Sequence, residues 1–408
     1  MSWSLFEVVG VELEYGIVRV DDLGVEPAAE RLLEQVAGEP GGEVVGDPVS
    51  WSNELAAHVL EFKLERPAPA LEGLAAAFQI EVRRALDALA PLGCRLLPGG
   101  CHPWMDPRRE SRLWRGEGHE VYETFDRIFG CRSHGWMNLQ SLHLNLPFHG
   151  DAEFDRLHSA IRVVLPLLPG LAASSPFLEG AATGLLDARL ASYRTHCATV
   201  TSFAGEIVPE PLTGRREYEE RIYDPIRRDL ERVDPSGVLQ PEWTNARGAI
   251  ARFDRGAIEI RLIDVQECPR MDLAVAALTV GAVRTLVERG DPSEQRAVPA
   301  AALATVLSAA IRDADRATLE DPGHLAALGL ARPAPLAEIW SALRDRVERE
   351  RPGELAEHAP ALDLIRDRGV LARRILRATG EAPDRDRLRE AYRGLADCLD
   401  RGEPFTAG

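Results

Sequence analysis

Lysine is nearly missing from this chain of 408 residues: Lys63 is the only one, and arginine supplies every other basic side chain. A mechanism that forms a lysine Schiff base could therefore use only Lys63. Any bound anion must be held by arginine, by backbone N–H groups or by a metal ion. There is no sustained basic run, and the formal net charge is −17 at pH 7. Because such a chain repels nucleic acid and anionic membrane surfaces, we expect neither as a partner.

Long apolar runs are also missing, since no stretch of 18 residues is free of charged residues or proline. A transmembrane segment is therefore not expected. The opening residues, MSWSLFEVVGVELEYG, lack the basic start of a signal peptide. The six cysteines are dispersed, and their spacing does not fit a zinc site. We therefore expect free thiols in a reducing compartment and a cytoplasmic protein.

Three common motifs are absent. The sequence has no G-x-x-x-x-G-K-[ST] phosphate loop, no G-x-G-x-x-G after a strand and no G-x-S-x-G elbow. A P-loop, a dinucleotide-binding fold and an α/β-hydrolase are thereby disfavoured. A bound nucleotide would have to be held by arginines and by metal ions on carboxylates.

Strand and helix patterns divide the chain into two parts. Alternating apolar and polar residues predict strands at 6–20, 56–65, 141–148, 245–254 and 257–265. Helical periodicity is found at 26–37, 71–89, 152–165, 217–233 and 271–289, with a break expected at Pro225. From residue 293 onward the pattern is helical almost throughout. We expect an α+β fold with a mixed region, 1–290, and a helical region, 291–408. The helical region could pack on the sheet or form a contact in a homo-oligomer, and periodicity leaves both open.

Four predicted strands carry polar side chains two residues apart, and such side chains share one face of a strand. The opposite face of each strand is apolar. The polar sets are Glu12 and Glu14 in VELEY, Glu61, Lys63 and Glu65 in LEFKLE, His143 and Asn145 in LHLNL, and Glu259 and Arg261 in IEIRL.

Two interpretations of these faces are open. Antiparallel sheets often have one face in water, and alternating charge is typical of such a face. A solvated face, however, usually mixes Lys, Thr, Ser and Gln, whereas three of these strands offer Glu and the fourth offers His with Asn. Several carboxylates on one face repel each other unless cations lie between them. Hard cations such as Mg²⁺ take oxygen ligands and keep positions open for phosphate. The pattern therefore favours a site for metal ions and a polyphosphate.

Several segments, in this order, resemble one known family. They are GVELEYG, HVLEFKLE, HPWMD, SLHLNLPF, ASSPFLEG with the following TG and ASYR, and IEIRLIDVQECP. Together they are similar to the glutamate–cysteine ligase family of carboxylate–amine ligases, in its bacterial second branch. The resemblance covers roughly residues 7–290, and the last third resembles the family only in being helical.

The resemblance implies a fold similar to the glutamine synthetase catalytic domain, in which an antiparallel sheet curves into a funnel flanked by helices. Its concave face would bind ATP and Mg²⁺, with Mn²⁺ as an alternative ion. By position, the implied metal ligands are Glu12, Glu14, Glu61, His143 and Glu259.

The resemblance also implies arginine contacts to phosphate or to a substrate carboxylate. Arg261 and Arg252 are the first candidates, with Arg194 and Arg247 behind them. Arginine can hold a transferring phosphoryl group through two hydrogen bonds at once. The chain departs from the family at Asn145, where many relatives have a second histidine. Asn145 could coordinate a cation only through its amide oxygen.

The implied reaction is ATP-dependent ligation of an amino-acid carboxylate to an amine through an acyl phosphate. Glutamate, through its γ-carboxylate, and cysteine are the family's usual small-molecule substrates. Two alternatives stay open: a catalytically silent small-molecule-binding relative, and a guanidino-phosphotransferase on a related fold. The latter would release a stable phospho-guanidine instead of free phosphate.

Overall fold

The apolar faces of the strands form the core of the molecule. The computed structural model describes residues 3–40 and 42–406. Within them, one antiparallel sheet of eight strands has the order β2–β3–β4–β1–β6–β10–β9, and β5 pairs with the far end of β1. Its strands are β1 (Gly10–Arg19), β2 (Glu43–Val44), β3 (Val49–Asn53), β4 (Val59–Leu64), β5 (Cys94–Leu97), β6 (Ser141–Pro147), β9 (Ala249–Arg252) and β10 (Ala257–Asp264).

The alternation of apolar residues positions the whole sheet. The apolar members of the four predicted strand motifs within β1, β4, β6 and β10 are buried, as is Tyr15, except for Leu64 at the end of β4, which is half-buried. Two short ladders lie outside the main sheet: β7 (Phe177–Leu178) with β8 (Ala181–Ala182), and β11 (Thr318–Leu319) with β12 (Ala334–Pro335). The prediction of an α+β fold with an antiparallel sheet flanked by helices is confirmed.

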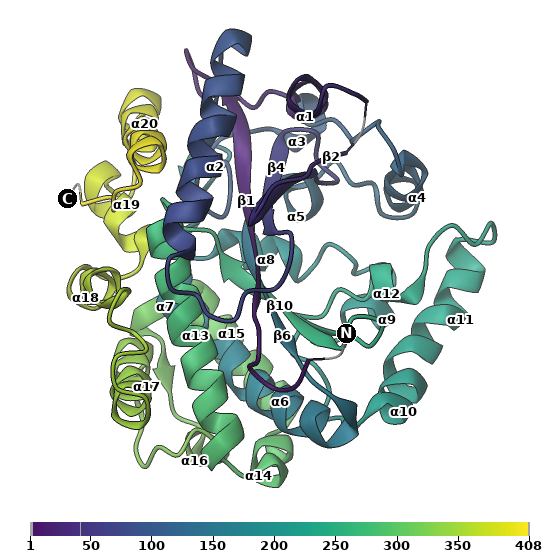
Figure 1. The fold of residues 1–408 in the computed structure, drawn as a ribbon, viewed down its shortest axis with the longest axis vertical. Helices are drawn as coiled ribbons and strands as arrows, with labels where there is room; N and C mark the ends of the chain where they lie inside the picture. Colours follow the sequence, from purple (N-terminus) through teal and green to yellow (C-terminus); the bar gives the residue numbers. More distant parts are fainter. Residues whose placement is uncertain (1–2, 41, 407–408) are drawn as a thin grey trace.

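Helices of the first two-thirds pack along the sheet and on one another, and Figure 1 shows α2, α13 and α6 running beside the strands. The longer ones are α1 (Ala29–Ala37), α2 (Leu74–Leu89), α4 (His119–Phe129), α6 (Gly150–Val164), α11 (Asp224–Val233) and α13 (Pro269–Arg289). The short ones are α3 (Pro107–Glu110), α5 (His134–Met137), α7 (Pro169–Ala172), α8 (Ala188–Tyr193), α9 (Thr201–Ala204), α10 (Arg215–Tyr218) and α12 (Pro241–Thr244).

The break expected at Pro225 takes the form of a wider turn. Residues Glu219–Tyr223 form a π-helical turn between α10 and α11, and Pro225 lies in the first turn of α11. Proline lacks the N–H that a helix interior needs, and a helix start tolerates that loss. A new helix, α11, therefore begins at Asp224–Pro225, so Pro225 does not kink a continuous helix.

The last third is helical and packs on the rest of the chain. Figure 1 shows α17 to α20 following one another along one side of the molecule. α17 and α18 pack on α13, and α20 packs on β5 and α2. The subunit-contact alternative and the boundary at residue 290 stay predictions. The helices are α14 (Pro292–Ala297), α15 (Ala300–Asp313), α16 (Pro322–Ala327), α17 (Leu336–Glu350), α18 (Ala359–Arg368), α19 (Leu371–Thr379) and α20 (Arg385–Arg401).

A buried ion pair ties the end of the chain to the sheet. Arg374 on α19 pairs with Glu267, which follows β10, and both side chains are almost fully buried. Arg374 also donates to the carbonyl of Phe405 at 2.7 Å, and the N–H of Phe405 donates to Glu267 at 3.0 Å. None of the helices in the described residues is long and apolar enough to cross a membrane.

Candidate functional site

Strand register gathers the predicted polar side chains on one face of the sheet. Residues directly opposite on antiparallel strands share a face. Glu12 on the central strand β1 lies opposite Lys63 of β4 on one side and His143 of β6 on the other. Glu14 lies opposite Glu61. The alternation that buries the apolar residues therefore brings these carboxylates and the imidazole together.

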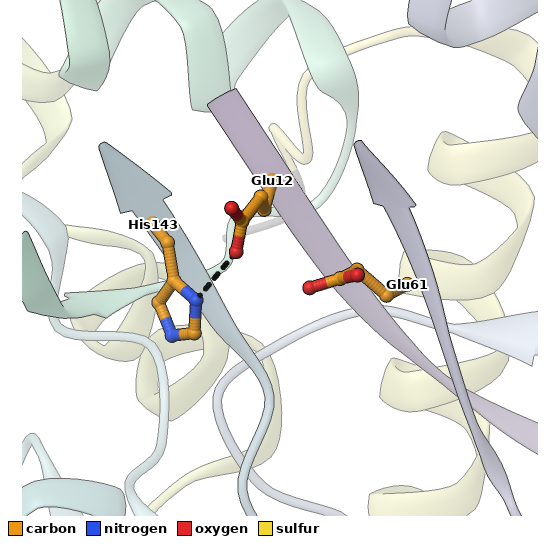
Figure 2. Close-up of side chains that lie close together, drawn as sticks. All are labelled: Glu12, Glu61 and His143. Atoms are coloured by element: carbon orange, nitrogen blue, oxygen red, sulfur yellow. Dashed lines mark hydrogen bonds and ion pairs between the residues drawn. The ribbon is translucent and has the colours of Figure 1, made fainter. Parts of the chain in front are cut away.

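Two groups of side chains have the spacing of metal ligands. In the first, one donor atom each of Glu12, Glu61 and His143 lies within 4.8 Å of the others. Figure 2 shows these three side chains converging from β1, β4 and β6. In the second group, Glu14, Glu54 and Glu61 meet the same criterion. Glu61 belongs to both groups, so the two candidate positions are adjacent.

Glu54 is the member that sequence reasoning missed. It directly follows β3, which pairs with β4 so that Ser52 lies opposite Glu61. The alternation of Val49 and Trp51 with two serines was the available signal for β3. The position of Glu54 one residue beyond the strand depends on the turn of the chain there, which alternation does not predict.

His143 is held between two glutamates. Its Nδ1 lies 3.1 Å from Oε2 of Glu12, and its Nε2 lies 2.9 Å from Oγ of Ser141 and 3.6 Å from Glu14. Glu14 accepts hydrogen bonds from the N–H of Ser141, at 2.8 Å, and from its hydroxyl. These contacts fix the orientation of the imidazole ring and of one carboxylate.

The carboxylates repel one another in this structure. Burial, and then the charges of Glu12 and Glu54, raise the pKa of Glu61 well above its usual range. Burial and the charge of Glu14 raise the pKa of Glu54. Burial also opposes ionisation of Glu12, but hydrogen bonding to His143 and its charge outweigh burial and lower that pKa. A cluster in which some carboxylates resist ionisation is one that a divalent cation would stabilise.

The donor set fits hard divalent cations. Two carboxylates and one imidazole make up the first group, and three carboxylates make up the second, so every second-group donor is oxygen. Mg²⁺ and Mn²⁺ favour such ligands. Three protein ligands per ion leave positions for phosphate oxygens or water. The residues present therefore fit the metal ions that the sequence predicts.

Glu259 lies on the same face but has different partners. It is opposite Asn145 in the sheet and pairs with Arg261 at 3.0 Å and Arg252 at 3.4 Å. Within the described residues it belongs to neither ligand group. Asn145 donates from Nδ2 to Glu12 at 3.0 Å. The metal-ligand role of Glu259 stays a prediction, and the structure places it as the anchor of two arginines.

Arg261 owes its position to a β-bulge. The pairing of β10 with β6 shifts between Ile260 and Ile263, while the N–H of Arg261 still donates to the carbonyl of Gly248. A bulge re-aims the side chain next to it. Arg261 thus pairs with Glu259 on one side and lines the cavity beside Glu14 on the other.

The other two predicted arginines are engaged elsewhere. Arg247 is buried, and it donates to both carboxylate oxygens of Glu210, at 2.6 and 2.7 Å, and to the carbonyl of Ser202. Arg194 donates to the hydroxyl of Ser308 on α15 at 2.8 Å. Among the described residues, neither arginine contacts a member of the two metal-ligand groups. We therefore leave Arg247 and Arg194 out of the proposed site.

A cavity of about 190 Å³ adjoins the second ligand group. Glu14, Glu54, His143 and Arg261 line one part of it. Most of the remaining wall is aromatic or apolar: Leu55, Val59, Tyr122, Phe125, Trp136, Leu139, Tyr193, His196, Cys197 and Trp243. The site thus combines a polar, metal-binding part with an apolar pocket.

Comparison with known proteins identifies the family of the chain. The profile of glutamate-cysteine ligase family 2 (GCS2) matches residues 8–394. An uncharacterized protein of Archaeoglobus fulgidus is 28% identical over 398 residues, covering 98% of this chain and all of that protein. A protein of Ectopseudomonas mendocina, provisionally named glutamate–cysteine ligase 2, is 29% identical over 293 residues, covering 71% of this chain and 67% of that protein.

Two solved structures share the fold. Glutamate–cysteine ligase of Francisella tularensis, in complex with AMP, has a TM-score of 0.62 at 13% identity, covering 98% of this chain and 90% of that one. A bifunctional glutathione synthetase of Pasteurella multocida has a TM-score of 0.60 at 14% identity, covering 96% and 53%.

The family profile, which matches nearly the whole chain, identifies a carboxylate–amine ligase. The protein belongs to glutamate-cysteine ligase family 2. The family resemblance seen in the sequence is confirmed, and so is the expectation of an enzyme.

Proposed function

We propose that the protein uses ATP to join the carboxylate of one small molecule to the amine of another through an acyl phosphate. The observation that carries this proposal is the pair of ligand groups sharing Glu61, with Arg261 and Arg252 on the same sheet face. The names of the relatives supply the starting pair of substrates, glutamate and cysteine, and we propose that glutamate reacts through its γ-carboxylate.

The first step transfers a phosphoryl group. A substrate carboxylate oxygen attacks the γ-phosphorus of ATP, the bond from that phosphorus to the β-bridging oxygen breaks, and ADP leaves. Both reactants are anions, so neutralising their charge is the main task of the site. Divalent cations, when bound, supply most of that neutralisation. Glu12, Glu61 and His143 would hold one ion, and Glu14, Glu54 and Glu61 the second.

Arg261 and Arg252 stabilise the negative charge on the phosphoryl group during its transfer. The Nε of Arg261 faces Glu259, and its two terminal nitrogens make no hydrogen bond to another described residue. They can therefore donate to the transferring phosphoryl group. Glu259 positions both guanidinium groups before the nucleotide arrives. Such preorganised donors lower the barrier because they need no rearrangement during the reaction.

The second step forms the amide. The amine nitrogen attacks the acyl carbon, the carbon–oxygen bond to phosphate breaks, and inorganic phosphate leaves. The ammonium form of the amine loses two protons in all, one before attack and one to the departing phosphate. No side-chain nucleophile is required, so the buried state of all six cysteines is compatible with this chemistry.

The test measures phosphate release and product mass for purified protein with ATP, Mg²⁺ and a panel of acids and amines. We expect phosphate only when an acid and an amine are both present, together with a condensed product. Glu61→Gln should abolish it. Glu65→Gln is the matched control, because Glu65 is exposed on the same strand face but lies outside both ligand groups. Nucleotide binding without turnover of any pair would indicate a silent relative, and a phospho-guanidine product a phosphotransferase.

A further inference from the structure

The cavity beside Glu14 and Glu54 is built for a ring-sized apolar group. An engineered apolar cavity of about 150 Å³ is large enough to bind benzene. The cavity here measures about 190 Å³, and its side walls are largely apolar and aromatic. The side chain of cysteine is much smaller than a ring, so it would leave part of this volume unfilled.

One wall of the cavity is a continuous series of rings. Phe125 and Trp136 have ring centroids 5.4 Å apart, Trp136 and His196 are 4.6 Å apart, and His196 stacks on Tyr193 at 4.4 Å. Burial lowers the pKa of His196 to about 4, so its ring is neutral near pH 7. Aromatic faces and edges in this series offer good contacts to a flat apolar ligand.

The Tyr193 hydroxyl and the Trp243 side chain offer further contacts to a ligand in the cavity. Tyr193 is buried, yet its hydroxyl makes no hydrogen bond to any other described residue. Buried hydroxyls normally have a partner, so a ligand group is the natural one here. Trp243 lines the same cavity and is 51% exposed, which is unusual for so large an apolar side chain.

Charges in the cavity select an amine over a second acid. Two arginines line it, but Arg189 is paired with Asp264 and Arg261 with Glu259. A dicarboxylic acid would therefore have to compete with the transferring phosphoryl group for the terminal nitrogens of Arg261, because Arg189 is held by Asp264. Before the second ion binds, the carboxylates of Glu14 and Glu54 border the same space and attract an ammonium group.

We propose that this cavity binds the amine substrate, and that this substrate is a primary amine carrying an aromatic or ring-sized apolar group in place of cysteine. The inference rests on the proposed ligase function and specifies its second substrate. The ring would lie against Trp136 and its neighbours, with the amino group toward the polar part of the cavity. After losing one proton, the amine nitrogen would face the acyl phosphate formed on the adjoining metal-binding part of the site.

A binding measurement tests the cavity without requiring turnover. Phenethylamine is titrated into the full-length protein and followed by tryptophan fluorescence, with methylamine and cysteine titrated in parallel. We expect phenethylamine to bind at least tenfold more tightly than either. Trp243→Ala should weaken phenethylamine binding at least threefold. Trp3→Ala is the matched control, because Trp3 is also partly exposed but does not line the cavity.

Turnover provides the second measurement. With ATP, Mg²⁺ and an acid that supports phosphate release, kcat/KM for phenethylamine should exceed that for cysteine at least tenfold. Trp136→Ala should lower the ratio of kcat/KM for phenethylamine to that for methylamine at least tenfold. Trp136→Phe, which keeps a ring in the wall, should restore most of this ratio.

Three outcomes would overturn the inference. Cysteine binding as tightly as phenethylamine would do so, and so would cysteine being the better substrate of a working ligase. Displacement of phenethylamine by adenosine, with adenosine bound more tightly, would assign the cavity to the nucleotide base. Absence of turnover with every acid and amine would instead contradict the proposed function, and the fluorescence titration would still decide what the cavity binds.

Discussion

Glu61 of β4 lies directly opposite Glu14 of β1 and also within metal-ligand distance of Glu12 and His143, so a single carboxylate joins two candidate ion positions. This sharing makes the two positions separable by mutation. Removing Glu61 affects both, whereas removing Glu54 affects only the second.

We expect Glu61→Gln to lose both metal ions and Glu54→Gln to lose one. Mn²⁺ binding, counted by electron paramagnetic resonance or calorimetry, should show two sites in the unmodified protein, one in Glu54→Gln and none of comparable affinity in Glu61→Gln. Because even outer partners of metal ligands change affinity about 10- to 100-fold, the loss for Glu61 should be at least ~100-fold. Equal stoichiometry in both variants would contradict the shared role of Glu61.

A glycine next to the site makes room for Asn145. A Cβ added to Gly10 would lie 2.9 Å from Cβ of Asn145, its partner across β1 and β6. Asn145 in turn donates to Glu12. Gly10→Ala should therefore destabilise the fold by ~1–3 kcal/mol, the usual range for overpacking, and disturb Glu12.

The double variant Gly10→Ala with Asn145→Gly provides the control. Removing the Cβ of Asn145 removes the clash, so the second substitution should recover part of the stability lost by the first. Urea unfolding of the four proteins in a double-mutant cycle measures this coupling. Additive effects would show that the close approach of the two residues is not the cause.

Substitution of buried Arg247 should affect stability, whereas substitution of half-buried Arg261 should affect activity. Arg247 has a bidentate pair with half-buried Glu210, so Arg247→Ala removes two charge-assisted hydrogen bonds. We expect a loss of ~1.5–3 kcal/mol in the free energy of unfolding. Arg261→Gln leaves Arg252 to pair with Glu259, so it should fold normally. Its rate of phosphate release should fall roughly 10³-fold, as expected for an arginine on a transferring phosphoryl group.

Urea unfolding and kcat measured on both variants test this contrast. If Arg247→Ala were stable but inactive while Arg261→Gln stayed active, Arg247 would be the arginine at the reacting phosphoryl group and Arg261 would not. That result would support the sequence-based prediction that Arg247 contacts the nucleotide.

The strand faces were predictable because their period is independent of tertiary structure. Alternation in VELEY, LEFKLE, LHLNL and IEIRL assigned Glu12, Glu14, Glu61 and His143 to one face, and the sheet brings them together. Strand order was not predictable from alternation alone. The family resemblance supplied that part, including the antiparallel sheet and its helices.

Two features near the site could not be predicted from the sequence, for physical reasons. β3 is only five residues long, and Glu54 reaches the carboxylates from just beyond its end. Arg247 precedes a strand of the site, but its direction depends on Glu210, 37 residues earlier in the chain. Such contacts depend on loop conformation and long-range packing, which leave no periodic signal in the sequence.

His158 on α6 provides a prediction for stability against pH. It is fully buried, stacks on Phe154 at 4.9 Å between ring centroids, and neither ring nitrogen bonds to another described residue. Burial, with nearby Arg162, lowers its pKa from 6.5 to about 3. Below about pH 6.5, His158 therefore binds a proton in the unfolded chain but stays neutral in the folded protein. The stability contribution is complete above that pH and falls as the pH falls toward 3.

Between pH 7 and pH 5, this histidine alone should reduce the free energy of unfolding by ~2 kcal/mol, since each pKa unit corresponds to ~1.4 kcal/mol. His158→Phe removes the proton-binding group and two unpaired nitrogens, so it should reduce the acid-induced loss by about that amount. Urea unfolding at both pH values measures the difference, with exposed His119→Phe as control. His58 and His102, whose pKa values burial also lowers, should keep some acid sensitivity in the variant. If His158→Phe lost as much unfolding free energy between pH 7 and pH 5 as the unmodified protein, His158 would bind its proton in the folded state without local unfolding.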